Sequence, residues 1–430
     1  MTPLFHRRLI AISLGIYFIA TWCTMAGMEI FGWLTFLLTV TYALRKEGRA
    51  QALEIANVMP WKICLSLLAI TIIGLLVNGT PNTNTIFDIG AQRWIFLLAS
   101  GSLAMTLCFP TLKGYRVFLI FTSITAVYAL VQCATGIDLV RPGEHRAVQP
   151  LFGMHAPWRS AGWFGLPLHY AYIAGQHVCL PFAMVLLTYR TRKSSGWLFW
   201  GSLGAALLIA ASIGTTFTRG AWISVSAAFF VMALIAAPRI AIGLVIAGIA
   251  GTGLLMSIWE TFRLRMLTLI DPTYFSNSER VFLWKANLEM FKDYPFFGIG
   301  YLENENRAGE YVTRMGHPDA FTGHAHSNYL QFLSGTGLTG FLTYLTLIIF
   351  MMWLTWRLWK SLPKDALWPR AIALGAIGAQ VSLHVGGFTE CNFKAGSTNH
   401  NFMVVWALVI ALTVITSRSL STLSISEERR

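Results

Sequence analysis

The chain has 430 residues, of which 55% are hydrophobic and only 12% are charged. Soluble domains carry about 25% charged residues, so this composition excludes an ordinary soluble protein. The formal net charge of +13 does not indicate nucleic-acid binding, because the basic residues follow the topology expected of a membrane protein.

Apolar runs of roughly 17–25 residues, long enough to cross a bilayer, recur along the whole sequence. They predict twelve membrane-spanning helices, near residues 9–25, 28–44, 61–78, 93–110, 115–135, 167–188, 196–214, 220–237, 239–258, 328–357, 368–388 and 398–416. The predicted fold class is an all-α polytopic membrane protein. The first run lacks a small-residue cleavage site, so we expect it to be retained as a helix.

The charge distribution predicts the orientation of the chain. With both termini inside, the inner segments hold 19 basic and five acidic residues, whereas the outer segments hold 13 basic and 14 acidic residues. The positive-inside rule predicts this asymmetry. The basic residues would therefore meet anionic lipid headgroups. The six cysteines lie mostly in apolar runs without metal-type spacing, so we expect buried free thiols.

Two long outer loops interrupt the spans, one near residues 135–166 and the other near 259–326. The chain therefore divides into a membrane region over 1–258 with nine spans, a large outer loop over 259–326, and a membrane region over 327–430. The last region holds three spans and a short inner tail. The large loop is rich in aromatic residues, which argues against disorder.

Part of the large loop has a helical pattern of its own. Ser276 and Glu279 match a capping box, so a helix is expected to begin there and to end at Tyr294-Pro295. An apolar stripe follows at spacings of three and four residues: Val281, Trp284, Leu288 and Phe291. This pattern predicts a short amphipathic helix on the outer membrane surface, with Arg280 in its first turn.

Three arginines stand at the outer ends of predicted helices. Arg159 precedes the sixth span, Arg219 lies between the seventh and eighth spans, and Arg280 opens the loop helix. Arginine at such depth costs free energy and tends to mark a specific partner, although snorkelling to lipid headgroups is the simpler alternative. Guanidinium groups bind phosphate bidentately, so three of them could hold a pyrophosphate without a metal ion.

His324 and His326 stand at the outer end of the tenth span. Imidazole titrates near neutral pH, which suits proton transfer, although the pair could also be merely interfacial polar residues. The acids of the large loop show no metal-binding pattern: Glu303, Glu305, Glu310 and Asp319. The arginines could neutralise a departing pyrophosphate, and a histidine could accept a proton from the attacking hydroxyl. This combination predicts a glycosyl transfer without metal or other cofactor.

The motifs around these residues, in their order along the chain, resemble those of O-antigen ligases and Wzy-type polymerases. The segment from His326 to Gln331, followed by Gly335, Gly337 and Gly340, is similar to that family's signature. The other matching segments are Arg159 with Gly162, Thr218-Arg219-Gly220-Ala221-Trp222, and Arg280-Val281-Phe282-Leu283-Trp284 leading to Pro295, Gly298 and Gly300. The resemblance covers about residues 155–345 closely.

The resemblance implies an inner-membrane, inverting glycosyltransferase of the metal-independent C type, with both termini cytoplasmic and its site in the periplasm. The donor would be an undecaprenyl-pyrophosphate-linked glycan. The acceptor would be a sugar hydroxyl of lipid A–core in a ligase, a second lipid-linked unit in a polymerase, or a protein hydroxyl in an O-oligosaccharyltransferase. Arg219 and Arg280, with Arg159 near them, would hold the pyrophosphate, and His326 would activate the acceptor.

Two histidines are candidates for the base. Family motifs often read His-Asn or His-x-His-Asn, whereas Ser327 follows His326 here, so either His324 or His326 could be the base. We favour His326, because it adjoins the expected helix cap at Ser327, and we expect His324 to orient or bind the acceptor. Ligase is favoured over polymerase from resemblance and length. A secondary transporter is disfavoured, because the chain has no internal repeat and its reactive groups gather at one face.

Overall fold

The computed structural model describes residues 2–78, 91–142, 149–150, 157–320 and 322–427. Its elements are α1 (Pro3–Cys23), α2 (Met25–Ala43), α3 (Lys46–Val58), α4 (Trp61–Val77), η1 (Ala91–Arg93), α6 (Trp94–Leu107), α7 (Leu112–Thr135), β1 (Gln149–Pro150), β2 (Trp158–Arg159), α8 (Pro167–His177), α9 (Cys179–Thr188), η3 (Tyr189–Thr191), α10 (Arg192–Ser195), α11 (Trp197–Gly214), α12 (Arg219–Ala236), α13 (Pro238–Ile258), α14 (Glu260–Leu267), α15 (Phe275–Asp293), α16 (Glu303–Asn306), α17 (Ala308–Arg314), α18 (Asn328–Ser361), α19 (Leu367–Gly386) and α20 (Gly396–Glu427).

The predicted all-α polytopic membrane fold is confirmed. Within the described residues, nine helices are long and apolar enough to span a membrane, or ten if the bent pair α3–α4 forms one span. We predicted about twelve. The other two predicted spans are helices as well, but α6 has only 14 residues and α19 is less apolar, because it contains residues such as Gln380 and His384.

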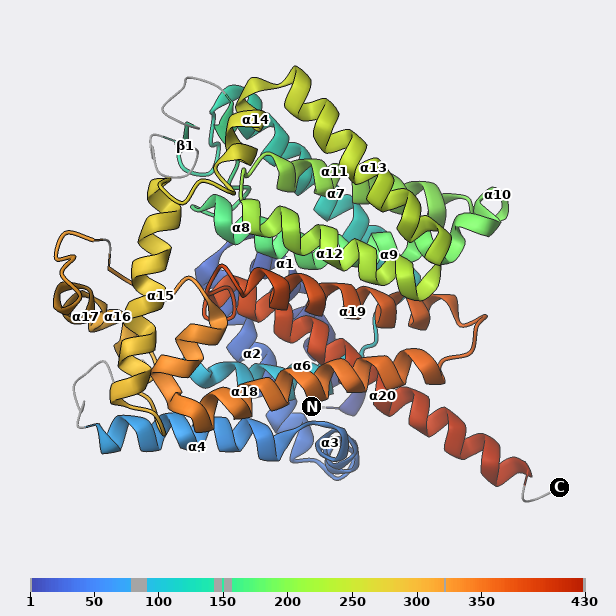
Figure 1. Cartoon of the computed structure of the whole chain (residues 1–430). Helices are drawn as coiled ribbons and strands as arrows, with labels where there is room; N and C mark the ends of the chain where they lie inside the picture. Colours follow the sequence, from blue (N-terminus) through green and yellow to red (C-terminus); the bar gives the residue numbers. More distant parts are fainter. Residues whose placement is uncertain (1, 79–90, 143–148, 151–156, 321, 428–430) are drawn as a thin grey trace.

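Helix α19 lies at the centre of the molecule and packs against α8, α9, α12, α18 and α20 (Figure 1). Nearly all of its residues from Ala371 to Gly386 are buried. Small residues let the neighbouring backbones approach closely: an added Cβ at Gly375 would meet the backbone of Leu180 at 3.0 Å. This close packing holds α19 in place, and the loop to α20 begins at its C-terminal end.

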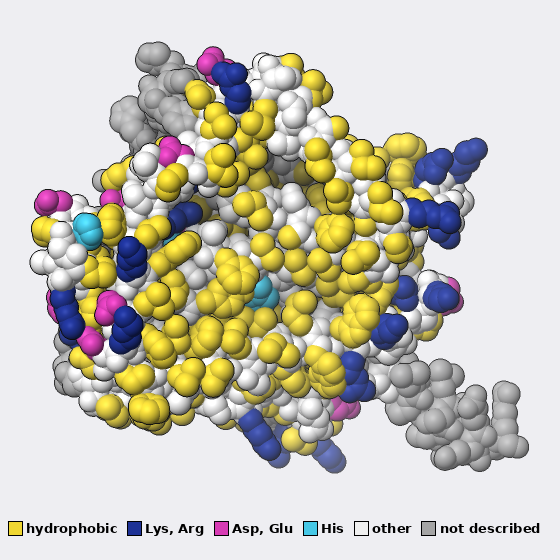
Figure 2. Space-filling view, viewed as in Figure 1, with side chains coloured by type: hydrophobic (Ala, Val, Ile, Leu, Met, Phe, Trp, Pro, Cys, Tyr) yellow, Lys and Arg dark blue, Asp and Glu magenta, His cyan; other side chains and the backbone are white. Residues whose placement is uncertain are grey.

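The outer helices present apolar side chains on their outward-facing surface. Figure 2 shows these side chains over the middle of one face, with charged side chains mainly at its two ends. Helix α13 is the extreme case, since Ala241 is the only residue of this helix that is buried. A belt of apolar side chains between charged ends is typical of a protein embedded in a bilayer. All six cysteines are free thiols, and four of them are buried as expected, whereas Cys23 and Cys108 are only partly buried.

Helix α15 runs across the ends of the spans, but its details differ from the prediction (Figure 1). It begins at Phe275, and the preceding Tyr274 makes no side-chain capping bond, so the capping box is wrong. Its buried face also differs from the predicted stripe and consists of Leu283, Ala286, Asn287 and Met290. Val281 and Leu288 are exposed. The buried face packs on α17 and α18 within the protein.

The segment after α15 is anchored to a break in α18. Helix α18 is interrupted at Gly337, whose φ of 65° lies in the left-handed region. The carbonyl oxygens of Ser334 and Gly335 accept hydrogen bonds from the backbone N–H groups of Ile299 (2.9 Å) and Gly300 (3.1 Å). An added Cβ at Gly298 would lie 2.4 Å from the Gly335 backbone. The break therefore fixes α15, which carries Arg280, against α18, which begins beside His326.

Candidate functional site

A cavity of about 240 Å³ lies at one end of the bundle and brings four of the five predicted site residues together. It lies between the first turns of α8 and α12, the helices α14 and α15, and the loop after α19. Arg159, Arg219, Arg280 and His326 all line it. Arg265, which we did not predict, lines it as well. A larger cavity of about 690 Å³ between α1, α7 and α19 is mainly apolar and contains none of these residues.

Arg219 is the first residue of α12 and is buried. Its guanidinium donates hydrogen bonds to the hydroxyl of Thr268 (2.8 Å) and to the side-chain oxygen of Asn277 (2.9 Å), and it lies over the ring of Tyr274. These partners are neutral, so the hydrogen bonds orient the guanidinium without cancelling its charge. The free N–H groups at the start of α12 add a positive partial charge at the same place.

Gly220 follows Arg219 and lets α12 begin close to the neighbouring elements. An added Cβ at this position would lie 2.7 Å from the Tyr172 hydroxyl and 2.7 Å from the Thr389 hydroxyl. Both distances are shorter than side chains tolerate. The glycine of the Thr-Arg-Gly segment is therefore needed because α8 and the loop after α19 approach α12 here.

Two further arginines are oriented by backbone carbonyl groups of the turn that precedes α12. Arg159, in the short strand β2, donates from Nε to the Thr216 carbonyl (3.0 Å). Arg265, in α14, donates from Nε to the Phe217 carbonyl (3.1 Å) and also contacts the Tyr274 hydroxyl (3.1 Å). This turn therefore gathers three of the arginines.

The arginines lie close enough together for their charges to affect one another's pKa values. Burial, followed by the charges of Arg265 and Arg219, lowers the pKa of Arg159 to about 10. Burial and the charge of Arg280 also lower the pKa of Arg265. Both groups remain protonated at neutral pH. Such shifts indicate a cluster of cations that a multivalent anion would stabilise.

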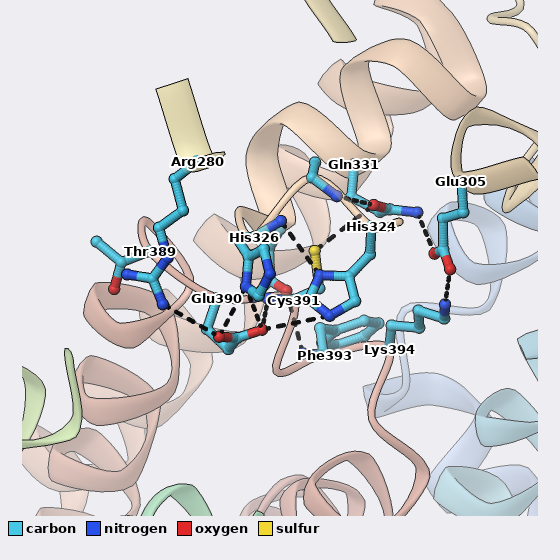
Figure 3. Close-up of polar contacts among 12 residues, drawn as sticks. Arg280, Glu305, His324, His326, Gln331, Thr389, Glu390, Cys391, Phe393 and Lys394 are labelled. Carbon is cyan, nitrogen blue, oxygen red and sulfur yellow. Dashed lines mark hydrogen bonds and ion pairs between the residues drawn. The ribbon is translucent and has the colours of Figure 1, made fainter. Parts of the chain in front are cut away.

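His326 is held between the helix cap and a buried carboxylate. Its φ of 46° is unusual for a residue with a side chain, and the following Ser327 caps α18. Its Nδ1 lies 3.1 and 3.2 Å from the two carboxylate oxygens of Glu390 (Figure 3). Donation of the Nδ1 proton to this carboxylate leaves the lone pair of Nε2 available to accept a proton.

Glu390 lies at the centre of the site. Only 3% of its surface is exposed, and its carboxylate also lies 3.7 Å from the guanidinium of Arg280 and 3.7 Å from Nε2 of His324. Burial alone would raise the pKa of Glu390, but the hydrogen bond from His326 and the neighbouring positive groups outweigh burial and lower this pKa. The carboxylate is therefore ionised at neutral pH and can fix the imidazole of His326.

His324 stands beside His326 but does not line the arginine cavity. The two rings are 4.1 Å apart, and the backbone N–H of His326 donates to Nδ1 of His324 (3.2 Å). Burial is the largest of the effects that lower the pKa of His324, to about 4. His324 is therefore neutral at physiological pH, with its proton on Nε2.

His324, His326 and Glu390 form the one group in the described part of the chain whose ligand atoms suit a metal ion, since these atoms lie within 4.8 Å of one another. Two imidazoles and a carboxylate are chemically suitable ligands. The guanidinium of Arg280 lies beside the same carboxylate, however, and its charge disfavours a second cation there. The orientation of His326 by Glu390 needs no metal.

Residues 203–345 match a family model described as O-antigen ligase. This region is similar to the O-antigen ligase family. The match confirms the predicted relationship to O-antigen ligases and Wzy-type polymerases, and it indicates an enzyme of the glycosyl-transfer type in a multi-pass membrane protein. A search of curated proteins finds no match. The matched region contains Arg219, Arg265, Arg280 and both histidines, and it ends before Glu390.

Proposed function

We propose that the protein is an O-antigen ligase that transfers a polysaccharide from undecaprenyl pyrophosphate to a sugar hydroxyl of lipid A–core. The observation that carries this proposal is one cavity that holds four arginines and a histidine oriented by a buried carboxylate. The four guanidinium groups would bind the pyrophosphate, and the histidine would act on the acceptor hydroxyl. The family match to O-antigen ligases supports the same reaction class.

The charges of the cavity suit a pyrophosphate. Four arginines face one carboxylate, and only Arg280 among them pairs with it in the described structure. The Nε atom of Arg280 is also buried without a hydrogen-bond partner in the described part of the chain. A buried donor without a partner costs free energy, which a phosphate oxygen would recover. This donor favours Arg280 as a direct ligand of the pyrophosphate.

In the transfer step, the acceptor oxygen bonds to the anomeric carbon while the bond from that carbon to the phosphate oxygen breaks. The proton of the acceptor hydroxyl passes to Nε2 of His326, and Glu390 stabilises the resulting imidazolium. Undecaprenyl pyrophosphate leaves with the bonding electron pair, and the arginines neutralise its growing charge. Attack from the side opposite the pyrophosphate inverts the anomeric centre. No step requires a metal ion.

We place this reaction at the periplasmic face of the inner membrane, with both termini in the cytoplasm. The excess of basic residues in the segments opposite the site supports this orientation. The undecaprenyl chain would then lie in the bilayer while the pyrophosphate enters the cavity.

A transfer assay tests the proposal. Purified protein is incubated with undecaprenyl-pyrophosphate-linked glycan and lipid A–core in the presence of EDTA. We expect polysaccharide on lipid A–core. Growth of the lipid-linked glycan with lipid A–core unmodified would identify a polymerase instead, and transfer to an added protein acceptor would identify an O-oligosaccharyltransferase. Loss of transfer with EDTA and recovery with Mg²⁺ or Mn²⁺ would overturn the metal-free step.

A further inference from the structure

The two histidines separate the arginine cavity from a second group of polar side chains. Figure 3 shows Arg280 and Thr389 on one side of the His326–Glu390 pair, and His324, Lys394 and Glu305 on the other. None of these last three residues lines the arginine cavity. This second group therefore needs an explanation other than pyrophosphate binding.

The second group is tied to the loop that carries the histidines. Lys394 and Glu305 form an ion pair. The other carboxylate oxygen of Glu305 accepts a hydrogen bond from the side-chain amide of Gln331 (2.7 Å). The side-chain oxygen of Gln331 in turn accepts the backbone N–H of Ala325 (3.0 Å), between the two histidines. These bonds hold the ion pair in a fixed position relative to His326.

The same side chains are accessible from outside the protein. The side chains of His324 and Lys394 are 33% and 30% exposed, and that of Glu305 is 18% exposed. Together they offer an ammonium donor, a carboxylate acceptor and a neutral imidazole N–H. Neighbouring hydroxyl groups on a sugar ring both donate and accept hydrogen bonds, so they can bind the ammonium, the carboxylate and the imidazole together. An anion only accepts hydrogen bonds and would be repelled by the carboxylate.

We propose that His324, Glu305 and Lys394 form the subsite for the acceptor sugar. This inference rests on the proposed function, because an inverting transfer places the acceptor and the pyrophosphate on opposite sides of the anomeric carbon. His326 faces the arginine cavity, and the second group lies just beyond it on the side away from Arg280. The acceptor hydroxyl reaches His326 while the neighbouring hydroxyl groups of the same sugar bind Glu305 and Lys394.

The test is equilibrium binding of lipid A–core to the purified full-length protein without donor. The variant is the double substitution Glu305→Gln/Lys394→Met, which removes both charges and keeps the approximate shape. We expect lipid A–core to bind about tenfold more weakly, as the loss of charge-assisted hydrogen bonds implies, while binding of the undecaprenyl-pyrophosphate-linked glycan stays unchanged. Retained donor binding shows that the variant is folded.

The matched control is Glu289→Gln/Lys292→Met, which removes an exposed ion pair on α15. This control should bind both substrates as the wild type does. Equal binding of lipid A–core by the wild type and the site variant would overturn the subsite, whatever the transfer assay shows. Failure of the proposed function is seen separately, when the wild-type protein transfers no glycan to lipid A–core.

Discussion

The Nδ1 atom of His326 lies 3.1 Å from a carboxylate oxygen of Glu390, although 64 residues separate the two in the sequence. This contact links the loop before α18 with the loop after α19. It favours the tautomer of His326 that the proposed role as a base requires, and the Glu390 carboxylate is also the one that Arg280 approaches. The proposed base and the proposed phosphate-binding cavity therefore share one buried anion.

Glu390→Gln should lower kcat for transfer by at least about tenfold while the KM for the donor stays nearly constant. The amide is uncharged, so it cannot stabilise the imidazolium that forms when His326 accepts a proton. Steady-state kinetics with both substrates measure this change. A kcat within twofold of the wild-type value would show that the carboxylate has no role in orienting the base.

Arg219→Lys should lose most of the transfer activity. Lysine keeps the charge, but a point charge cannot replace the planar guanidinium that Thr268 and Asn277 orient. Arg314→Lys is the control, because Arg314 lies in α17, does not line the cavity, and forms an exposed pair with Asp293. Similar activity of Arg219→Lys and Arg314→Lys would mean that Arg219 only contacts lipid headgroups.

Arg265→Gln should raise the KM for the lipid-linked donor by about tenfold, because one of the four guanidinium groups of the proposed pyrophosphate site is lost. The control is Arg263→Gln, two residues earlier, whose side chain is 51% exposed and pairs with Glu260. Thermal unfolding of both variants separates an effect on binding from loss of the hydrogen bond to the Phe217 carbonyl. An unchanged donor KM would remove Arg265 from the phosphate site.

His324 should make the folded protein less stable in acid. Its pKa is lowered to about 4 in the folded protein from the ordinary value of 6.5. Between these two pH values the unfolded chain binds a proton that the folded protein does not, so stability falls as the pH is lowered from 6.5 towards 4. His324→Asn should therefore lose less thermal stability than the wild type over this range. Parallel melting temperatures across the range would contradict the lowered pKa.

The sequence was sufficient to predict most of the membrane-spanning helices and four of the residues that line the cavity. Apolar runs determine the spans, and Arg159, Arg219, Arg280 and His326 lie in short motifs at the ends of predicted helices. Arg265 could not be distinguished from Arg263, because the difference between them is burial. The sequence also does not show whether Glu390 lines the cavity or stands in a solvated turn, because its burial depends on contacts with residues far away in the sequence.

The local sequence pattern also does not predict which face of α15 is buried. Two apolar or neutral stripes are present on this helix, and the one that is buried includes Asn287. Its side-chain oxygen accepts hydrogen bonds from Asn304 (3.0 Å) and Ser334 (2.6 Å). Long-range polar contacts of this kind select one face over another that looks more apolar in the sequence.

The most direct test of the central claim is the rate of transfer by His326→Ala, measured with purified protein, lipid-linked glycan and lipid A–core in EDTA. Loss of the general base should lower kcat by about 10²–10⁴-fold while the donor still binds, because the arginines remain in place. Transfer at more than a tenth of the wild-type rate would contradict the assignment of His326 as the base.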